Sequence, residues 1–325
     1  MKGEEKSVSK LYISMYHYVR ELKNSRYPDI KGLDYDLFRQ QIEFFKNNFS
    51  VVTMEEVIAS VQEGYDLPEN ALLLTFDDGY IDCYTSVFPV LKEYGFQGSF
   101  FVPGKVFREH KLLDVNKIHF LLASAPVGQL YDELLKKMDH YRGEECGYAP
   151  NEELIEKYAV ANRFDTKETI FIKRMLQVVL PEMIRKKIAD DFFTKYVDVR
   201  EEVLAREIYM NYDQMKFMKR EGMFFGSHGY DHYWMNSLTP KELEQDIEAA
   251  LESMDGLLDI SKWVVNYPCG SYSEDVIQYV KEKGAVLGLS TDVRIADTKK
   301  DDRFKLPRLD TNDFPPKSEN YIKLG

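Results

Sequence analysis

Cysteine is scarce in this sequence, and long apolar runs are missing from it. The 325 residues include 3 cysteines, Cys83, Cys146 and Cys269. An odd and widely spaced set of this kind is not the framework of a disulfide-rich secreted domain, and it fits a reducing compartment. A membrane-spanning helix needs a run of about 18 apolar residues, which the chain lacks, and its first residues do not have the pattern of a signal peptide. We therefore expect a cytoplasmic protein without a membrane span.

Positive charge is also in deficit. Lysine and arginine number 43 against 55 aspartates and glutamates, which gives a formal net charge of -12. Proteins that bind nucleic acid or anionic membranes usually neutralise phosphates with a basic face, so neither partner is expected. With 44% hydrophobic and 30% charged residues, the chain has the composition of an ordinary globular protein with a sizeable core.

Three regions of the chain differ in their hydrophobic pattern. From residue 10 to 104, short apolar runs alternate with helical patterns, and the same alternation resumes after residue 206. Residues 106–206 are helical and heavily charged throughout. Alternating strands and helices are typical of a parallel sheet or barrel. The pattern predicts an α/β protein, a single distorted (β/α) barrel over residues 1–325 with a helical insertion at 106–206. A separate helical domain is the alternative.

Two adjacent carboxylates, Asp77 and Asp78, follow the apolar run "ALLLTF" directly. Gly79 gives the backbone the freedom to turn just after the strand, so both carboxylates should lie at the carboxyl end of a parallel strand, where such barrels carry catalytic groups. Neighbouring carboxylates repel each other unless a positive charge lies close to them. Taken alone, the pair is more often part of an ordinary turn or a helix N-cap than of a site.

A pair of histidines makes a metal site the better explanation. His228 and His232 follow another apolar run, and they account for two of only 6 histidines in the chain. At a spacing of four, a helical or turn-like backbone presents both imidazoles to one ion. Two imidazoles and one carboxylate leave a coordination position open for water, which is the arrangement of a catalytic zinc site.

Together, "TFDDG", "HGYDH" and the later "YPCG" resemble the motifs of the NodB-type polysaccharide deacetylases, carbohydrate esterase family 4. The resemblance implies a NodB-type barrel that binds a divalent metal, with zinc as the expected ion. It also implies that the protein hydrolyses the acetamide of an N-acetylated amino sugar, a carbohydrate substrate. By motif position, Asp77 would be the general base, and Asp78, His228 and His232 the metal ligands. The metal would then absorb the charge of Asp78 and let Asp77 stay ionised beside it.

The segment "NYPCG" departs from the family pattern Arg-x-Pro-aromatic-Gly. Asn266 stands where the family has the arginine that holds the catalytic aspartate. Cys269 stands at the position whose backbone N–H stabilises the oxyanion, a role that a change of side chain need not abolish. Arg308, in "FKLPRLD", is a candidate for the missing cation, and a surface salt bridge is the alternative for it.

The second departure is that no histidine follows His232, whereas the family has a late histidine that protonates the leaving amine. His17, in "YISMYHYV", closes what should be the first barrel strand and would therefore lie at the same rim. The branch that resembles the poly-N-acetylglucosamine deacetylases carries such a Tyr-His near its start, which makes His17 the candidate general acid. A strand-end histidine bonded to a carbonyl is the alternative.

Two other functions are compatible with the sequence. Related barrels hydrolyse other C–N amide bonds, such as those of cyclic imides or allantoin-like compounds. The absent arginine and late histidine could instead mark a metal-bound glycan-binding protein without turnover. The insertion is expected to roof the cleft or to form a homo-oligomer contact.

Overall fold

The computed structural model describes residues 9–143 and 147–324, so Cys146 lies outside the described residues. The chain folds into two compact units, which are described separately. The first unit is formed by the described residues of Met1–Glu21, Gly32–His110 and Arg206–Gly325, and the second by those of Leu22–Lys31 and Lys111–Ala205.

The first unit is built on a curled, mostly parallel sheet in the order β10-β1-β5-β6-β7-β8-β9, with β4 and β11 paired to β5 and β1. The order confirms the predicted α/β class, because successive strands lie side by side and are joined by helices. The strands of the chain are β1 Lys10–Tyr16, β2 Val19–Arg20, β3 Leu33–Asp34, β4 Ser50–Val51, β5 Ala71–Asp77, β6 Ser99–Val102, β7 Phe224–Ser227, β8 Trp263–Asn266, β9 Ala285–Leu289, β10 Ala296–Asp297 and β11 Leu309–Asp310.

A short segment near the C-terminus links the last long strand back to the first. Leu306 forms a parallel bridge with Leu289 at the end of β9. Three residues further on, Leu309 in β11 pairs with Ser14 of β1. The segment therefore stands where a closed barrel would have another strand, and it gives the barrel the predicted distortion.

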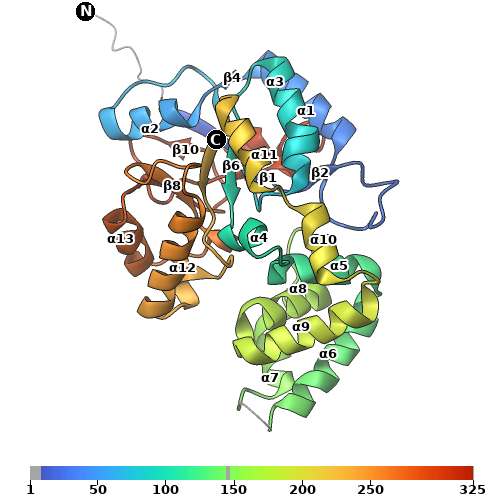
Figure 1. The fold of residues 1–325 in the computed structure, drawn as a ribbon. Helices are drawn as coiled ribbons and strands as arrows, with labels where there is room; N and C mark the ends of the chain where they lie inside the picture. The colour runs from blue at the N-terminus through green and yellow to red at the C-terminus, as the bar shows by residue number, and fades with distance from the viewer. Residues whose placement is uncertain (1–8, 144–146, 325) are drawn as a thin grey trace, which may run out of the picture. The chain divides into compact units, whose positions relative to one another are not determined.

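Helices surround this sheet, and their first turns carry strong N-terminal signals in the sequence. Thr53, Asn211 and Thr239 each form a capping box with the Glu or Gln three residues later, which satisfies backbone N–H groups at the helix start. Near the sheet, α12 and α13 lie next to each other (Figure 1). The helices of the first unit are α1 Tyr35–Asn48, α2 Met54–Glu63, α3 Phe88–Tyr94, α4 Gly104–Arg108, α11 Tyr212–Arg220, α12 Pro240–Ser253, α13 Glu274–Glu282 and α14 Asn320–Lys323.

Strand β5 is the centre of the first unit, and every one of its residues is buried. A parallel strand covered on both faces is expected to be a continuous apolar run, and "ALLLTF" fits that expectation. The ring of Phe76 stacks between Tyr16, at 4.9 Å, and Phe100, at 5.0 Å. This packing fixes the strand end that carries Asp77.

The second unit is helical in all the elements that the structure describes, and it has a hydrophobic core of its own. Leu22–Lys31 joins it because Tyr27 packs edge-on against Phe120 and because the Lys31 ammonium pairs with Asp165. The proposed roles of this region, as a roof or as an oligomer contact, stay predictions. Its helices are α5 Asp114–Ser124, α6 Val127–Tyr141, α7 Asn151–Tyr158, α8 Lys167–Arg174 and α9 Glu182–Tyr196, and α10 Glu201–Ile208 leads from it back to the first unit.

None of the helices in the described part of the chain combines the length and the apolar character that crossing a membrane would require.

Replacing Phe76 with alanine should destabilise the first unit strongly. Removing a fully buried phenylalanine costs about 3–5 kcal/mol, because the cavity is only partly refilled. We expect a loss of that size in the free energy of unfolding, measured by urea denaturation. Phe217→Ala is the matched control, since Phe217 is 39% exposed on α11, and its effect should be clearly smaller.

Candidate functional site

The predicted site residues lie at or after the carboxyl ends of parallel strands, with the exception of Arg308. Asp77 is the last residue of β5, Asn266 is the last of β8, and His228 directly follows β7. His17 directly follows β1, and Arg308 directly precedes β11. The carboxyl edge of the sheet is the usual place for catalytic groups in such barrels. The fold therefore collects at one rim residues that lie up to 291 positions apart in the sequence.

The backbone turns sharply after Asp77. Asp78 and Gly79 both have left-handed backbone angles, with φ of 69° and 70°. Aspartate tolerates this conformation better than most residues. At Gly79 a Cβ would lie 2.5 Å from Cγ1 of Val102, so a side chain is excluded there. The turn sends the two adjacent carboxylates to different partners.

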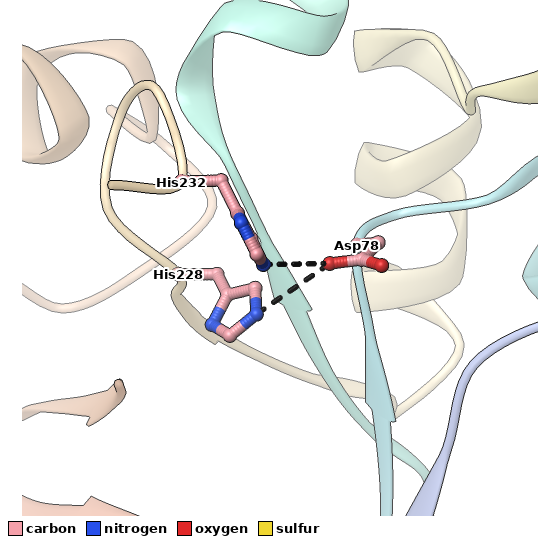
Figure 2. A group of neighbouring side chains, drawn as sticks. All are labelled: Asp78, His228 and His232. Carbon is pink, nitrogen blue, oxygen red and sulfur yellow. Dashed lines mark ion pairs between the residues drawn. The ribbon is translucent and has the colours of Figure 1, made fainter. Parts of the chain in front are cut away.

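Asp78 faces the two histidines across a small gap (Figure 2). Its Oδ1 atom lies 3.5 Å from Nε2 of His228 and 3.4 Å from Nε2 of His232. This oxygen is buried and makes no hydrogen bond, which is costly unless a cation satisfies it. The three ligand atoms all lie within 4.8 Å of one another. One carboxylate oxygen and two imidazole nitrogens fit a zinc-type site.

The ring of His228 is oriented by a contact on its far side. Its Nδ1 atom lies 2.6 Å from the backbone oxygen of Asn266. Because a carbonyl oxygen can only accept, Nδ1 carries a proton, and Nε2 is the ring nitrogen that faces Asp78. Metal-ligating histidines are commonly fixed in this way by a second hydrogen bond.

The loop between the two histidines is held by Asp246, a residue that the sequence analysis did not identify. Its carboxylate, on α12, accepts the backbone N–H groups of Tyr230 and Asp231 at 3.0 and 2.9 Å. Burial raises its pKa, although these two N–H groups lower it in part. A buried carboxylate between Leu243 and Ile247 on the apolar side of the helix is the signal that could have revealed it.

Asp77 is held by an arginine and an amide. Arg308 donates from Nη1 to Oδ1 and from Nη2 to Oδ2, both at 2.9 Å. Asn266 donates from Nδ2 to Oδ1 at 2.7 Å. Burial raises the pKa of Asp77, but the charge of Arg308, followed by those of His228 and His17, outweighs it and brings that pKa below its usual value. The carboxylate is thus kept ionised although it is buried.

Arg308 is itself fixed inside the barrel and is only 1% exposed. Its Nε donates to the backbone oxygen of Ser290 at 2.9 Å, and its Nη1 also reaches Oγ1 of Thr75 at 3.2 Å. The structure therefore places this arginine at Asp77 rather than in a surface salt bridge. Asn266, which stands where the family pattern has an arginine, thus contacts Asp77 together with Arg308.

His17 lies beside the same carboxylate. Its Nε2 is 3.9 Å from Oδ2 of Asp77, and its side chain is 40% exposed. A partly exposed imidazole next to a fixed carboxylate can exchange protons with solvent and with a bound substrate.

Cys269 lies in the turn Pro268–Gly270 after β8, with a left-handed φ of 56°. Its role as an oxyanion donor stays a prediction.

Tyr80 is the other residue whose role the sequence analysis did not identify. Its hydroxyl donates to Oδ2 of Asp78 at 2.6 Å. Burial raises the pKa of Tyr80 well above its usual value, and the charge of Asp78 adds to the effect, so the phenol stays protonated. A tyrosine two residues after a candidate metal-ligand aspartate was the available signal.

The chain matches a known protein family. The family model of polysaccharide deacetylases matches residues 64–141 and 160–288, which is more than half of the chain. The chain therefore belongs to the polysaccharide deacetylase family, and the resemblance inferred from the motifs is confirmed.

Two relatives show the level of sequence identity between this chain and other members of the family. YxkH of Bacillus subtilis (strain 168), a protein assigned to the polysaccharide deacetylases, is 20% identical over 87% of this chain, and the match spans 65% of its own length. The poly-β-1,6-N-acetyl-D-glucosamine N-deacetylase of Escherichia coli (strain K12) is 31% identical over 25% of this chain and 12% of its own length. The chain thus spans less than two thirds of the length of either relative.

Solved structures support the fold. The Streptococcus pyogenes deacetylase PplD, in complex with acetate, covers 97% of this chain and 96% of its own, with a TM-score of 0.58 at 18% identity. IcaB from Ammonifex degensii covers 97% of this chain and 95% of its own, with a TM-score of 0.54 at 17% identity. These likenesses confirm the predicted distorted barrel of the NodB type with its long helical insertion.

Removing Arg308 should destabilise the protein in a pH-dependent manner. Because the pKa of Asp77 is lower in the folded chain than the unfolded value of about 3.9, the pair stabilises the fold above that pH and loses its effect as the pH falls through the folded pKa. In Arg308→Met burial still raises the pKa of Asp77, while the largest opposing charge is lost. At pH 7 the metal-free variant should lose about 3–5 kcal/mol of unfolding free energy, with a smaller loss below pH 4.

The matched control is Arg294→Met, since Arg294 pairs with Asp301 at the surface and its side chain is 46% exposed. Its effect should be about 0–1 kcal/mol. Equal losses in the two variants, or a loss in Arg308→Met that grows toward acid pH, would contradict the assignment.

Proposed function

We propose that this protein is a metal-dependent N-deacetylase, which hydrolyses the acetamide of an N-acetylated amino sugar in a glycan to a free amine and acetate. The proposal rests above all on one observation. Asp77 is a buried, ionised carboxylate with a fixed orientation, and its neighbour Asp78 belongs to a set of converging metal-ligand atoms. Membership of the polysaccharide deacetylase family supports the substrate class.

Asp78, His228 and His232 would hold the cation, for which zinc suits the mixture of one oxygen and two nitrogens. A bound divalent cation would polarise the substrate carbonyl and acidify a nearby water. The chain contributes the ligand geometry, because Asn266 orients His228 and Asp246 holds the loop between the histidines.

Asp77 would accept the proton of the attacking water as the new C–O bond forms. Its lowered pKa keeps it ionised at neutral pH, and its contacts with Arg308 and Asn266 prevent the carboxylate from rotating toward the metal ligands. A base that is both ionised and fixed loses little entropy in the proton transfer. The backbone N–H of Cys269 would contribute to stabilising the oxyanion.

His17 would supply a proton from Nε2 to the sugar nitrogen as the C–N bond breaks. Its Nε2 lies 3.9 Å from Oδ2 of Asp77, so the proton donor and the proton acceptor flank one place where the acetamide can bind. The hypothesis of a glycan-binding protein without turnover depended on a missing cation and a missing acid. The positions of Arg308 and His17 support catalysis instead.

Replacing the base with its amide should abolish turnover without preventing metal binding. Asp77→Asn should lower kcat by about 10²–10⁴-fold, because the amide cannot take the proton of water. The measurement is acetate release from N-acetylglucosamine oligomers by zinc-loaded protein, with zinc content determined in parallel. Asp275→Asn, at the exposed start of α13, is the control. Undiminished release by Asp77→Asn would contradict the assignment, and no release by the wild type would contradict deacetylation of these sugars.

Two substrates separate the role of His17 from a structural one. A sugar amine must be protonated as it leaves, whereas nitrophenolate leaves without a proton. His17→Gln should therefore lower kcat for the acetamide by about 10²–10⁴-fold, and for p-nitrophenyl acetate by about tenfold or less. Equal losses on both substrates would show that His17 only shapes the site.

A further inference from the structure

Three tyrosine rings stand in parallel behind the candidate metal site. The ring of Tyr80 stacks on Tyr18, with centroids 3.8 Å apart and an interplanar angle of 21°. The ring of Tyr80 also stacks on Tyr209, with centroids 6.0 Å apart and an interplanar angle of 10°. All three side chains are buried. The metal ligand Asp78 is hydrogen-bonded to the middle ring, the ring with the least room to move.

Backbone contacts anchor the stack on one side. Tyr80 and Tyr209 form an antiparallel bridge, and the N–H of Met210 donates to the carbonyl oxygen of Gly79 at 2.9 Å. The segment that follows α10 is thereby tied to the turn that carries Asp78. A shift of the ring would therefore require a shift of this backbone pair.

An ion pair anchors the other side. The guanidinium of Arg20 lies 4.7 Å from the ring centroid of Tyr18, and its Nε donates to Asp82 at 2.7 Å. Asp82 also accepts the backbone N–H of Val19 at 3.2 Å. Stacking of a cation on an aromatic face is favourable. Arg20, which Asp82 holds in place, therefore helps to fix the ring of Tyr18 beside Tyr80.

The hydroxyl of Tyr80 distinguishes the two oxygens of Asp78. It donates to Oδ2 at 2.6 Å, while Oδ1 makes no hydrogen bond and faces the two histidines. A carboxylate that binds a metal through both oxygens needs both sets of lone pairs directed to the ion. The hydrogen bond turns Oδ2 to the phenol instead.

We propose that Tyr80 is a positioning residue that makes Asp78 a one-oxygen ligand and so preserves coordination positions for water and the substrate carbonyl. The inference rests on the metal site of the proposed function. The stack holds the phenol in place before any metal binds, so the orientation of the carboxylate costs little entropy on binding. Partners of this kind typically contribute about 10–100-fold to metal affinity.

Removal of the single hydroxyl tests the proposal. In Tyr80→Phe the ring and its stacking remain, but Oδ2 loses its donor, so zinc affinity measured by competition with a chromophoric chelator should fall about 10–100-fold. Tyr84→Phe is the matched control, because Tyr84 lies four residues later and its ring packs on Phe88 at 6.2 Å. The control should bind zinc like the wild type. The metal-free Tyr80→Phe protein should still unfold in one cooperative transition, at a melting temperature lowered only by the loss of one buried hydrogen bond, which separates positioning from a loss of fold.

X-ray absorption on the zinc-loaded wild type tests the same point without a variant. The proposal predicts one carboxylate oxygen from Asp78 at the ion, and a two-oxygen carboxylate would overturn it. Equal zinc affinity of Tyr80→Phe and the wild type would overturn it as well, while leaving the metal site intact. Failure of the wild type to bind zinc would instead contradict the proposed function itself.

Discussion

The buried ion pair between Asp77 and Arg308 is the constraint on which the arrangement of the site depends. A lone carboxylate as buried as Asp77 would take up a proton and would then be unable to act as a base. Two parallel hydrogen bonds at 2.9 Å keep it charged and fix its plane. Arg308 can reach it because the segment Leu306–Asp310 runs between the ends of β9 and β1. The distortion of the barrel thus brings Arg308 within hydrogen-bonding distance of Asp77.

The ion pair with Arg308 gives Asp77 partners that differ from those of its neighbour Asp78. Asp77 is held by Arg308 and Asn266 on one side of the turn, while Asp78 is held by Tyr80 and faces His228 and His232 on the other. The left-handed backbone at Asp78 turns the two side chains apart. Asn266 contacts both groups, since its side chain reaches Asp77 and its carbonyl orients His228. The proposed base and the candidate metal ligands are therefore positioned together.

Much of the fold could be predicted from the sequence, because parallel strands and capped helices leave local patterns. The run "ALLLTF" and the capping boxes at Thr53 and Thr239 are of this kind. Asp77, Asp78 and the histidines could be found because they lie at or soon after the end of an apolar run, in motifs with a recognisable spacing. For Asp246 and Tyr80 the sequence offered only weak signals, since their roles depend on which loop or carboxylate lies opposite them in space. For Arg308 the sequence left two possibilities, because the two-residue strand that follows it has almost no pattern.

A crystal structure of the zinc-loaded protein tests the division of tasks most directly. The account predicts one ion bound by Oδ1 of Asp78 and by Nε2 of His228 and His232, at about 2.0–2.2 Å, with Asp77 still paired to Arg308 and not coordinated. An ion bound by Asp77, or an ion elsewhere with these three side chains unoccupied, would contradict it.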